Sequence, residues 1–78
     1  IEQREALLCA LRAIDRLAPE RREVFVLHEL CELPMREVAA RLRCPLKTAF
    51  SRLYAARRAL LGELREAGVL AALQQWPG

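Results

Sequence analysis

Apolar residues recur three and four positions apart along most of the chain, and no stretch alternates in the way that marks a strand. The first such stretch predicts a helix over residues 2–17. We expect its packed stripe to consist of Leu7, Leu8, Leu11, Ile14 and Leu17. Pro19 ends this helix because its ring removes the amide hydrogen that the helix ladder needs.

Pro19 and Glu20 also suit the first turn of a second helix, predicted over residues 20–31. One face of this helix carries Val24, Leu27, His28 and Cys31, with Phe25 and Leu30 beside it. A third, shorter helix is predicted over residues 34–42, with its outer side formed by Arg36 and Arg41 and its inner side by Val38, Ala39 and Leu42. Three residues, 43–45, separate it from the next helix.

The fourth predicted helix is the longest, and its stripe is formed by Leu46, Ala49, Leu53, Ala56, Leu60 and Leu64. Gly68 ends it, as glycine commonly does at a helix C-terminus. Residues 69–76 have the composition for one more short helix. The large apolar residues placed to meet between the third and fourth helices are Val38, Leu42, Leu53 and Leu60.

A short helix, a three-residue turn and a longer helix form the helix-turn-helix arrangement, in which the second helix enters the DNA major groove. The expected fold is therefore all-α, a domain of four to five helices without the wing of winged-helix proteins. With 78 residues, the chain has room for one domain, which spans residues 1–78. Since it begins at Ile1 and not at Met, we expect it to be a piece of a longer protein.

The outer face of the fourth helix carries the candidate chemistry. Lys47, Ser51, Tyr54 and Arg58 lie four, three and four positions apart, and Phe50 and Arg65 lie close to them. Lysine and arginine bind phosphates or guanine edges, serine binds either, and aromatic rings pack on thymine methyl groups or sugars. A merely solvated helix face accounts for the cations, but it rarely presents two aromatic rings together.

Charge is unevenly divided between the two halves of the chain. Residues 1–33 carry a net charge of −2 and residues 34–66 a net charge of +5, while the last twelve residues are uncharged. This distribution is expected when one face of a protein meets phosphates and another does not.

The remaining candidates for chemistry are few. Cys9, Cys31 and Cys44 have neither the spacing of a disulfide framework nor that of a zinc site, and we interpret Cys31 and His28 as structural. The single histidine has no serine, aspartate or second cysteine at catalytic spacing, so we expect no enzyme, no catalytic residue, no metal and no cofactor. Without a signal peptide or a membrane-spanning run, the expected location is the cytoplasm, with no membrane partner.

Residues 17–60 resemble region four of bacterial sigma factors, especially those of the extracytoplasmic-function group. The resemblance rests on three segments: Leu-Ala-Pro-Glu-Arg-Arg-Glu-Val-Phe-Val-Leu at 17–27, Leu-Pro-Met-Arg-Glu-Val-Ala at 33–39, and Cys-Pro-Leu-Lys-Thr-Ala-Phe-Ser-Arg-Leu-Tyr-Ala-Ala-Arg-Arg-Ala-Leu at 44–60. The specific parts are Cys-Pro before the last of these helices and Thr-x-x-Ser-Arg-Leu-x-x-Ala-Arg within it. LuxR-type regulators share the helix-turn-helix but usually lack them.

The resemblance implies a role in transcription initiation. Such a domain reads the upstream, minus-thirty-five promoter element and grips the flap of the RNA polymerase β subunit, and an anti-sigma factor is a further possible partner. The DNA-binding residues that we expect are Lys47, Thr48, Phe50, Ser51, Arg52, Tyr54, Arg57 and Arg58. On the family pattern, Phe50, Ser51, Tyr54 and Ala55 match base-facing positions, whereas Arg52, Arg57 and Arg58 match positions near phosphates or in internal salt bridges. We expect the polymerase contact on the acidic side, where Val26 and Leu30 lie near the surface.

The sequence departs from the family pattern at several of these positions. The family often has a cation where Phe50 and Ala55 stand, glycine where Lys47 and Arg43 stand, and serine where Pro34 stands. Two interpretations remain open: the departures change the bases that are read, or they mark a degenerate domain that binds protein in place of DNA. An ordinary LuxR-type regulator is the third hypothesis.

Overall fold

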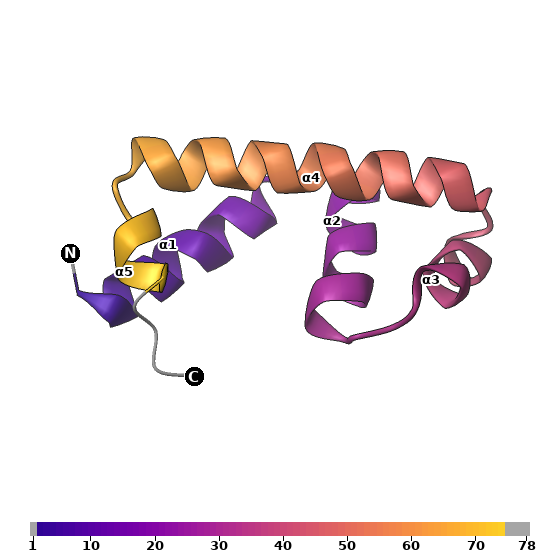
Figure 1. Cartoon of the computed structure of the whole chain (residues 1–78), viewed down its shortest axis with the longest axis horizontal. Coiled ribbons are helices and arrows are strands. Elements are labelled where there is room, and N and C mark those ends of the chain that lie inside the picture. Colours follow the sequence, from indigo (N-terminus) through magenta and orange to yellow (C-terminus); the bar gives the residue numbers. More distant parts are fainter. Residues whose placement is uncertain (1, 75–78) are drawn as a thin grey trace.

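A computed structural model of the chain describes residues 2–74, in which five α-helices and one π-helical turn follow one another without a strand. The all-α prediction is confirmed. The molecule is flat and elongated, with principal extents of 39 × 23 × 15 Å. Its spine is α4 (Leu46–Glu66), and the other helices pack on one side of it (Figure 1).

The N-terminal half of α4 is packed by α2 (Pro19–Phe25), the π-helical turn η1 (Val26–Leu30) and α3 (Met35–Leu42). α2 begins at a proline in its first turn, as expected. The buried residues of this half form the first core cluster: Val24, Met35, Val38, Ala39, Ala49 and Leu53. Leu42, Cys44 and Phe50 pack against it from its edges.

The C-terminal half of α4 is packed by α1 (Gln3–Asp15), on which α5 (Leu70–Gln74) lies in turn (Figure 1). The second core cluster consists of Ala13, Leu17, Ala56 and Leu60. Arg16 joins the two helices by donating from Nε and Nη2 to the Glu63 carboxylate at 3.3 and 3.0 Å. This hydrogen bond and the attraction of the carboxylate raise the pKa of the Arg16 guanidinium. The predicted extra helix is present as α5, although part of residues 69–76 lies outside the described residues.

The apolar stripe predicted for α1 is wrong in three of its five members. Leu7, Leu8 and Leu11 are 41%, 46% and 48% exposed, whereas Ala6 and Ala13 are buried. Alanine lets the helix backbones approach closely. The packed face of α1 is therefore the one that carries the small residues Ala6 and Ala13, and the leucines lie beside it. Leu60 is also misplaced by the sequence analysis, because it lies in the second cluster and not between α3 and α4.

The second helix widens before it ends. The amide of Cys31 donates to the carbonyl oxygen of Val26 at 3.0 Å, a bond across five residues that defines a π-helical turn. This wide turn rotates the residues after it away from the α-helical phase. Cys31 is consequently exposed, and its predicted place on the packed face is wrong.

The helices α3 and α4 end in the same hydrogen-bonded motif. After α3, the amides of Cys44 and Arg43 donate to the carbonyl oxygens of Ala39 and Ala40, at 3.1 and 3.3 Å. After α4, the amides of Val69 and Gly68 donate to Leu64 and Arg65, both at 3.1 Å. These paired bonds are those of the Schellman motif, whose penultimate residue takes a left-handed conformation. That residue is Arg43 in one case (φ 54°) and Gly68 in the other (φ 71°).

Candidate nucleic-acid interface

The pair formed by α3 and α4 has the geometry of a helix-turn-helix. Only residues 43–45 separate the two helices, and the prolines before each one, Pro34 and Pro45, stand at the N-cap position in extended conformation. Val38 and Ala49, both fully buried, and Leu53 hold the two helices together. The N-terminal half of α4 is thereby fixed with one side inward and the opposite side free.

Four residues of α4 form an exposed row, which we call the recognition row: Lys47, Ser51, Tyr54 and Arg58. At 100° per residue, this row lies opposite the buried face formed by Ala49, Leu53, Ala56 and Leu60. The helical phase predicted from the sequence is therefore right over these turns. No other side chain within residues 2–74 makes an ion pair or hydrogen bond with Lys47 or Arg58, so both charges are available to an external partner.

Unlike the residues of the recognition row, Phe50 contacts both the core and an exposed side chain. Its side chain is half-buried and packs against the first core cluster. Its ring also lies against that of Tyr54, with the centroids 5.9 Å apart and the planes tilted by 36°. This contact holds the exposed Tyr54 ring in its place in the row. Of the other predicted site residues, Thr48 and Arg52 are half-buried on the same helix.

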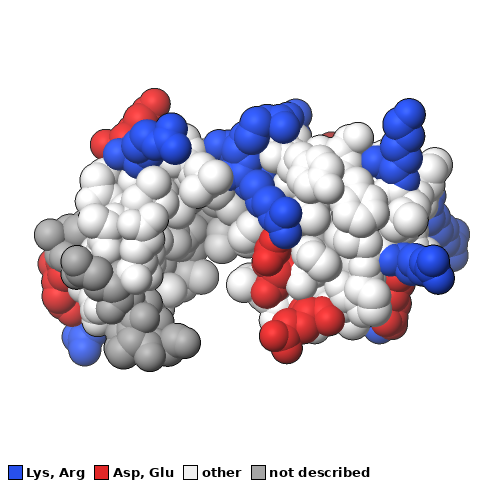
Figure 2. All heavy atoms as spheres, viewed as in Figure 1, with Lys and Arg blue, Asp and Glu red and all other residues white. Residues whose placement is uncertain are grey.

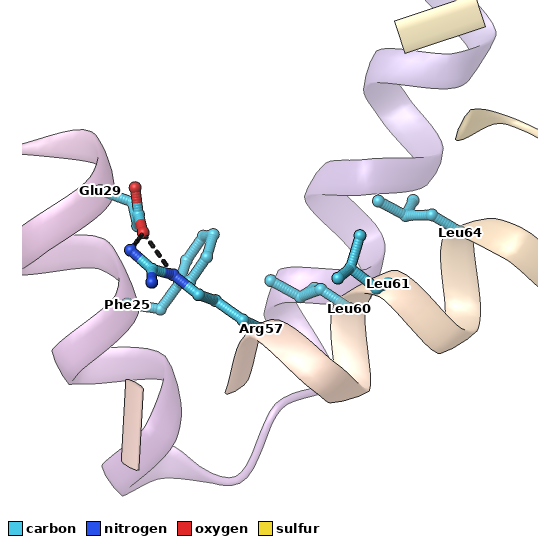
Figure 3. A pocket seen from close by; sticks show the side chains of 6 residues that line it. All are labelled: Phe25, Glu29, Arg57, Leu60, Leu61 and Leu64. Carbon is cyan, nitrogen blue, oxygen red and sulfur yellow. Dashed lines mark hydrogen bonds and ion pairs between the residues drawn. The ribbon is translucent and has the colours of Figure 1, made fainter. Parts of the chain in front are cut away.

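Arg57 lies outside the row, on the flank of α4 that faces the π-helical turn. Its Nε donates to Oε1 of Glu29 at 2.8 Å, and its Nη2 donates to the same oxygen (Figure 3). The structure therefore places Arg57 in an internal ion pair, which is one of the two roles that the family pattern implied for it.

Behind this ion pair lies an apolar groove between η1 and the C-terminal half of α4, with a volume of about 350 Å³. Its lining consists of Phe25, Glu29, Arg57, Leu60, Leu61 and Leu64 (Figure 3). We call it the apolar groove. Sequence patterns did not reveal it, because its walls come from helices whose separation depends on packing. The only feature of the sequence that points to this groove is the excess of leucines toward the end of α4.

Cations are prominent on the folded surface around α3 and α4 (Figure 2). In Figure 2, lysine and arginine atoms lie along the edge formed by α4 and over α3. Acidic atoms lie at the far end of η1, and also beside α3 and at the end of the molecule where α1 and the C-terminal part of α4 lie. The exposed cations around the turn are Arg36, Arg41, Arg43 and Lys47. Arg41 is paired with Glu37 at 3.1 Å, and the sequence analysis did not count Arg36 or Arg43 among the site residues.

The half-buried His28 has a local structural contact. Its Nδ1 donates to the carbonyl oxygen of Leu33 at 2.9 Å, which fixes the loop between η1 and α3. Within residues 2–74, there is no group of three or more histidine, cysteine, aspartate or glutamate side chains that could hold a metal ion. None of the helices in this range combines the length and the apolar composition that crossing a bilayer requires.

Comparison with known protein families matches residues 7–60 to one family, described as Sigma-70, region 4. The matched range runs from α1 to the middle of α4, and it includes the whole helix-turn-helix and the whole recognition row. No curated protein matches the chain at a significant level.

Proposed function

Because the chain belongs to the sigma-70 region 4 family, we propose that its recognition row reads the minus-thirty-five promoter element while its apolar side holds the polymerase β flap. Membership of the family gives the chain a role in promoter recognition during transcription initiation, with promoter DNA and the RNA polymerase core as partners. The family is a DNA-binding and not a catalytic one. Membership of the extracytoplasmic-function group remains a prediction, as does a cytoplasmic location.

The observation that carries the DNA proposal is the position of the recognition row on the second helix of the motif. Lys47 and Arg58 stand at its two ends, with charges that no side chain of residues 2–74 pairs, which suits contacts to the phosphates on either side of the major groove. Ser51 and Tyr54, between them, suit base edges or thymine methyl groups, and Phe50 supports Tyr54 from the core side. The cations thus provide affinity and the central residues provide sequence discrimination.

Salt-dependent binding tests this division. Replacing Lys47 or Arg58 by alanine should weaken binding to every duplex and reduce the slope of log affinity against log salt by about one unit. Arg12→Ala, on the exposed side of α1, is the matched control and should change neither quantity. Fluorescence anisotropy of the domain on cognate and scrambled duplexes measures both. If the unsubstituted domain showed no salt-dependent binding to any duplex, the alternative of a domain that binds protein in place of DNA would be favoured.

The polymerase contact is proposed on the side formed by α2, η1 and the apolar groove. Leu30 is 57% exposed and Leu61 is 48% exposed, and neither lies on the recognition row. An open apolar groove such as the one that Leu61 lines is typical of a protein interface. An anti-sigma factor is expected to compete for the same side, because it also has to exclude the polymerase.

Charged substitutions on this side test the flap contact. Leu30→Asp and Leu61→Asp should each reduce binding to the β flap by about tenfold or more, since each puts a charge into an apolar interface. Circular dichroism should show unchanged helix content because both residues are exposed in the free domain. Leu8→Asp, on an exposed leucine of α1 outside the groove lining, is the control. Unchanged flap binding by both Leu30→Asp and Leu61→Asp would rule out this side.

A further inference from the structure

The two Schellman motifs of the chain allow a direct comparison of what occupies the left-handed position. At the end of α4 the position is filled by Gly68, the residue for which a positive φ carries no steric cost. At the end of α3 the same hydrogen bonds are made around Arg43. A side chain in this conformation brings Cβ close to the following carbonyl oxygen, which disfavours it. The arginine is therefore not there to stabilise the turn.

Within the fold, the Arg43 side chain has no compensating contact. It is exposed, and among residues 2–74 it makes neither an ion pair nor a side-chain hydrogen bond. Arg41, two residues earlier, is held by Glu37. An external partner compensates for such a cost where the surrounding residues favour one.

The position of Arg43 indicates the chemistry of that partner. It stands in the turn directly before α4, four residues ahead of Lys47 and two residues after the exposed Arg41 of α3. Figure 2 shows lysine and arginine atoms gathered over α3 and the start of α4. When the second helix of such a motif enters the major groove, the first helix crosses the DNA backbone, so the turn between them lies close to that backbone. Arginine is the side chain best suited to bind a phosphate with two parallel hydrogen bonds.

We propose that Arg43 is a phosphate anchor of the turn, which binds the DNA backbone beside the recognition row and exchanges stability of the free domain for affinity. This inference rests on the proposed DNA-binding function. It assigns to Arg43 a contact that is independent of base sequence, so the anchor holds the recognition helix in register without choosing the bases.

Three substitutions separate charge from backbone strain at this position. Arg43→Gly removes both, Arg43→Ala removes the charge and keeps the strain, and Arg43→Lys keeps both. We expect Arg43→Gly and Arg43→Ala to lose about 3- to 10-fold in affinity for cognate and scrambled duplexes alike, and about one unit of salt slope. Arg43→Lys should retain most of the affinity. Only Arg43→Gly should raise the melting temperature, by about 2 to 6 °C.

Two matched controls complete the experiment. Arg41→Ala removes a neighbouring arginine that is already paired and should change the affinity by less than about twofold. Glu32→Gly relieves the other positive φ of a non-glycine residue, at 58°, in the loop after η1. It should raise the melting temperature without weakening DNA binding.

The outcomes distinguish the inference from the proposal on which it rests. If Arg58→Ala weakens binding but Arg43→Ala and Arg43→Gly do not, the anchor is disproved while the proposed function stands. A parent domain that binds no duplex overturns both. Equal losses for Arg41→Ala and Arg43→Ala would mean that the turn contributes only a diffuse positive potential, which also contradicts the anchor. A drop in melting temperature for Arg43→Gly would show that the arginine serves the fold.

Discussion

The two halves of α4 are packed in different ways, although one continuous helix runs through both. The N-terminal half is covered by a core of six buried residues, four with branched or long side chains and two alanines, and the recognition row on its outer surface is polar and cationic. Under the C-terminal half, the second core cluster has four buried residues, two of which are alanines. Ala6 and Val69 are buried outside that cluster, and leucines remain exposed around it. Leu7, Leu8, Leu11 and Leu61 are each more than 40% exposed there.

This difference connects packing with function. In the N-terminal half of α4 the buried Leu53 faces inward and the recognition row carries charge, which suits a contact to phosphates. The exposed Leu30 of η1 lies off that row. Where small residues make the helix contact, large apolar residues stay outside, and one of them, Leu61, lines the apolar groove, which suits a contact to protein. The domain thus offers two chemically distinct surfaces, the recognition row and the apolar groove, at different places along the same helix.

The largest expected effect is on stability in the N-terminal half. Leu53 is 1% exposed in the middle of the first cluster, so Leu53→Ala should lower the free energy of unfolding by about 2 to 5 kcal/mol. Leu60→Ala, beside alanines and the open groove, should cost about 2 kcal/mol, at the lower end of that range. Urea denaturation followed by circular dichroism measures both.

The exposed Leu61 serves as the control for these truncations, and Leu61→Ala should change stability by less than about 0.5 kcal/mol. If Leu60→Ala proved as costly as Leu53→Ala, the two clusters would be equally well packed and the contrast between the halves would not hold.

An intermediate effect is expected on DNA discrimination at Phe50. Phe50→Ala should reduce the preference for the cognate over the scrambled duplex by about 1 kcal/mol, with little change in salt slope because no charge is lost. Phe50→Leu keeps an apolar side chain against the core, and it separates loss of the aromatic contact from loss of stability. Phe50→Lys should raise affinity for DNA in general and shift the preferred bases. An unchanged preference in Phe50→Ala, measured by anisotropy, would limit Phe50 to the core.

The smallest effect is expected from the ion pair between the halves. Glu29→Gln removes the charge that holds Arg57, and because both side chains are partly exposed, it should cost about 0.2 to 1 kcal/mol of stability. The loss should shrink at high salt, since screening weakens the pair. DNA affinity should stay the same, as Arg57 lies off the recognition row. A several-fold gain in affinity would mean that the released Arg57 reaches the phosphates.

Much of this architecture is predictable from the sequence. The helix order, the short turn at residues 43–45 and the phase of α4 follow from apolar spacing, because the stripe Ala49, Leu53, Ala56 and Leu60 keeps a constant helical period. The resemblance to region four is confirmed by the family match over residues 7–60. The assignment of individual DNA contacts stays a prediction.

Other features depend on information that spacing does not contain. Leucine is the stronger hydrophobic signal, but in α1 the close helix contact is made by Ala6 and Ala13, whose small size decides which face packs. The continuous stripe predicts that Leu60 lies between α3 and α4. Yet α3 has 8 residues and α4 has 21, so α3 covers only part of the stripe. The Glu29–Arg57 pair joins residues 28 positions apart and depends on the π-helical turn, which has no sequence pattern of its own.

The uninterrupted course of α4 sets a length scale for the DNA that the domain can read. From Lys47 to Arg58 the helix advances eleven residues, or about 16 Å at 1.5 Å per residue. Stacked base pairs are about 3.4 Å apart, so the recognition row is as long as roughly five base pairs. A straight helix has no joint with which to extend this reach. Any preference of the domain for bases beyond that footprint has to come from the shape or bending of the DNA and not from side chains of the row.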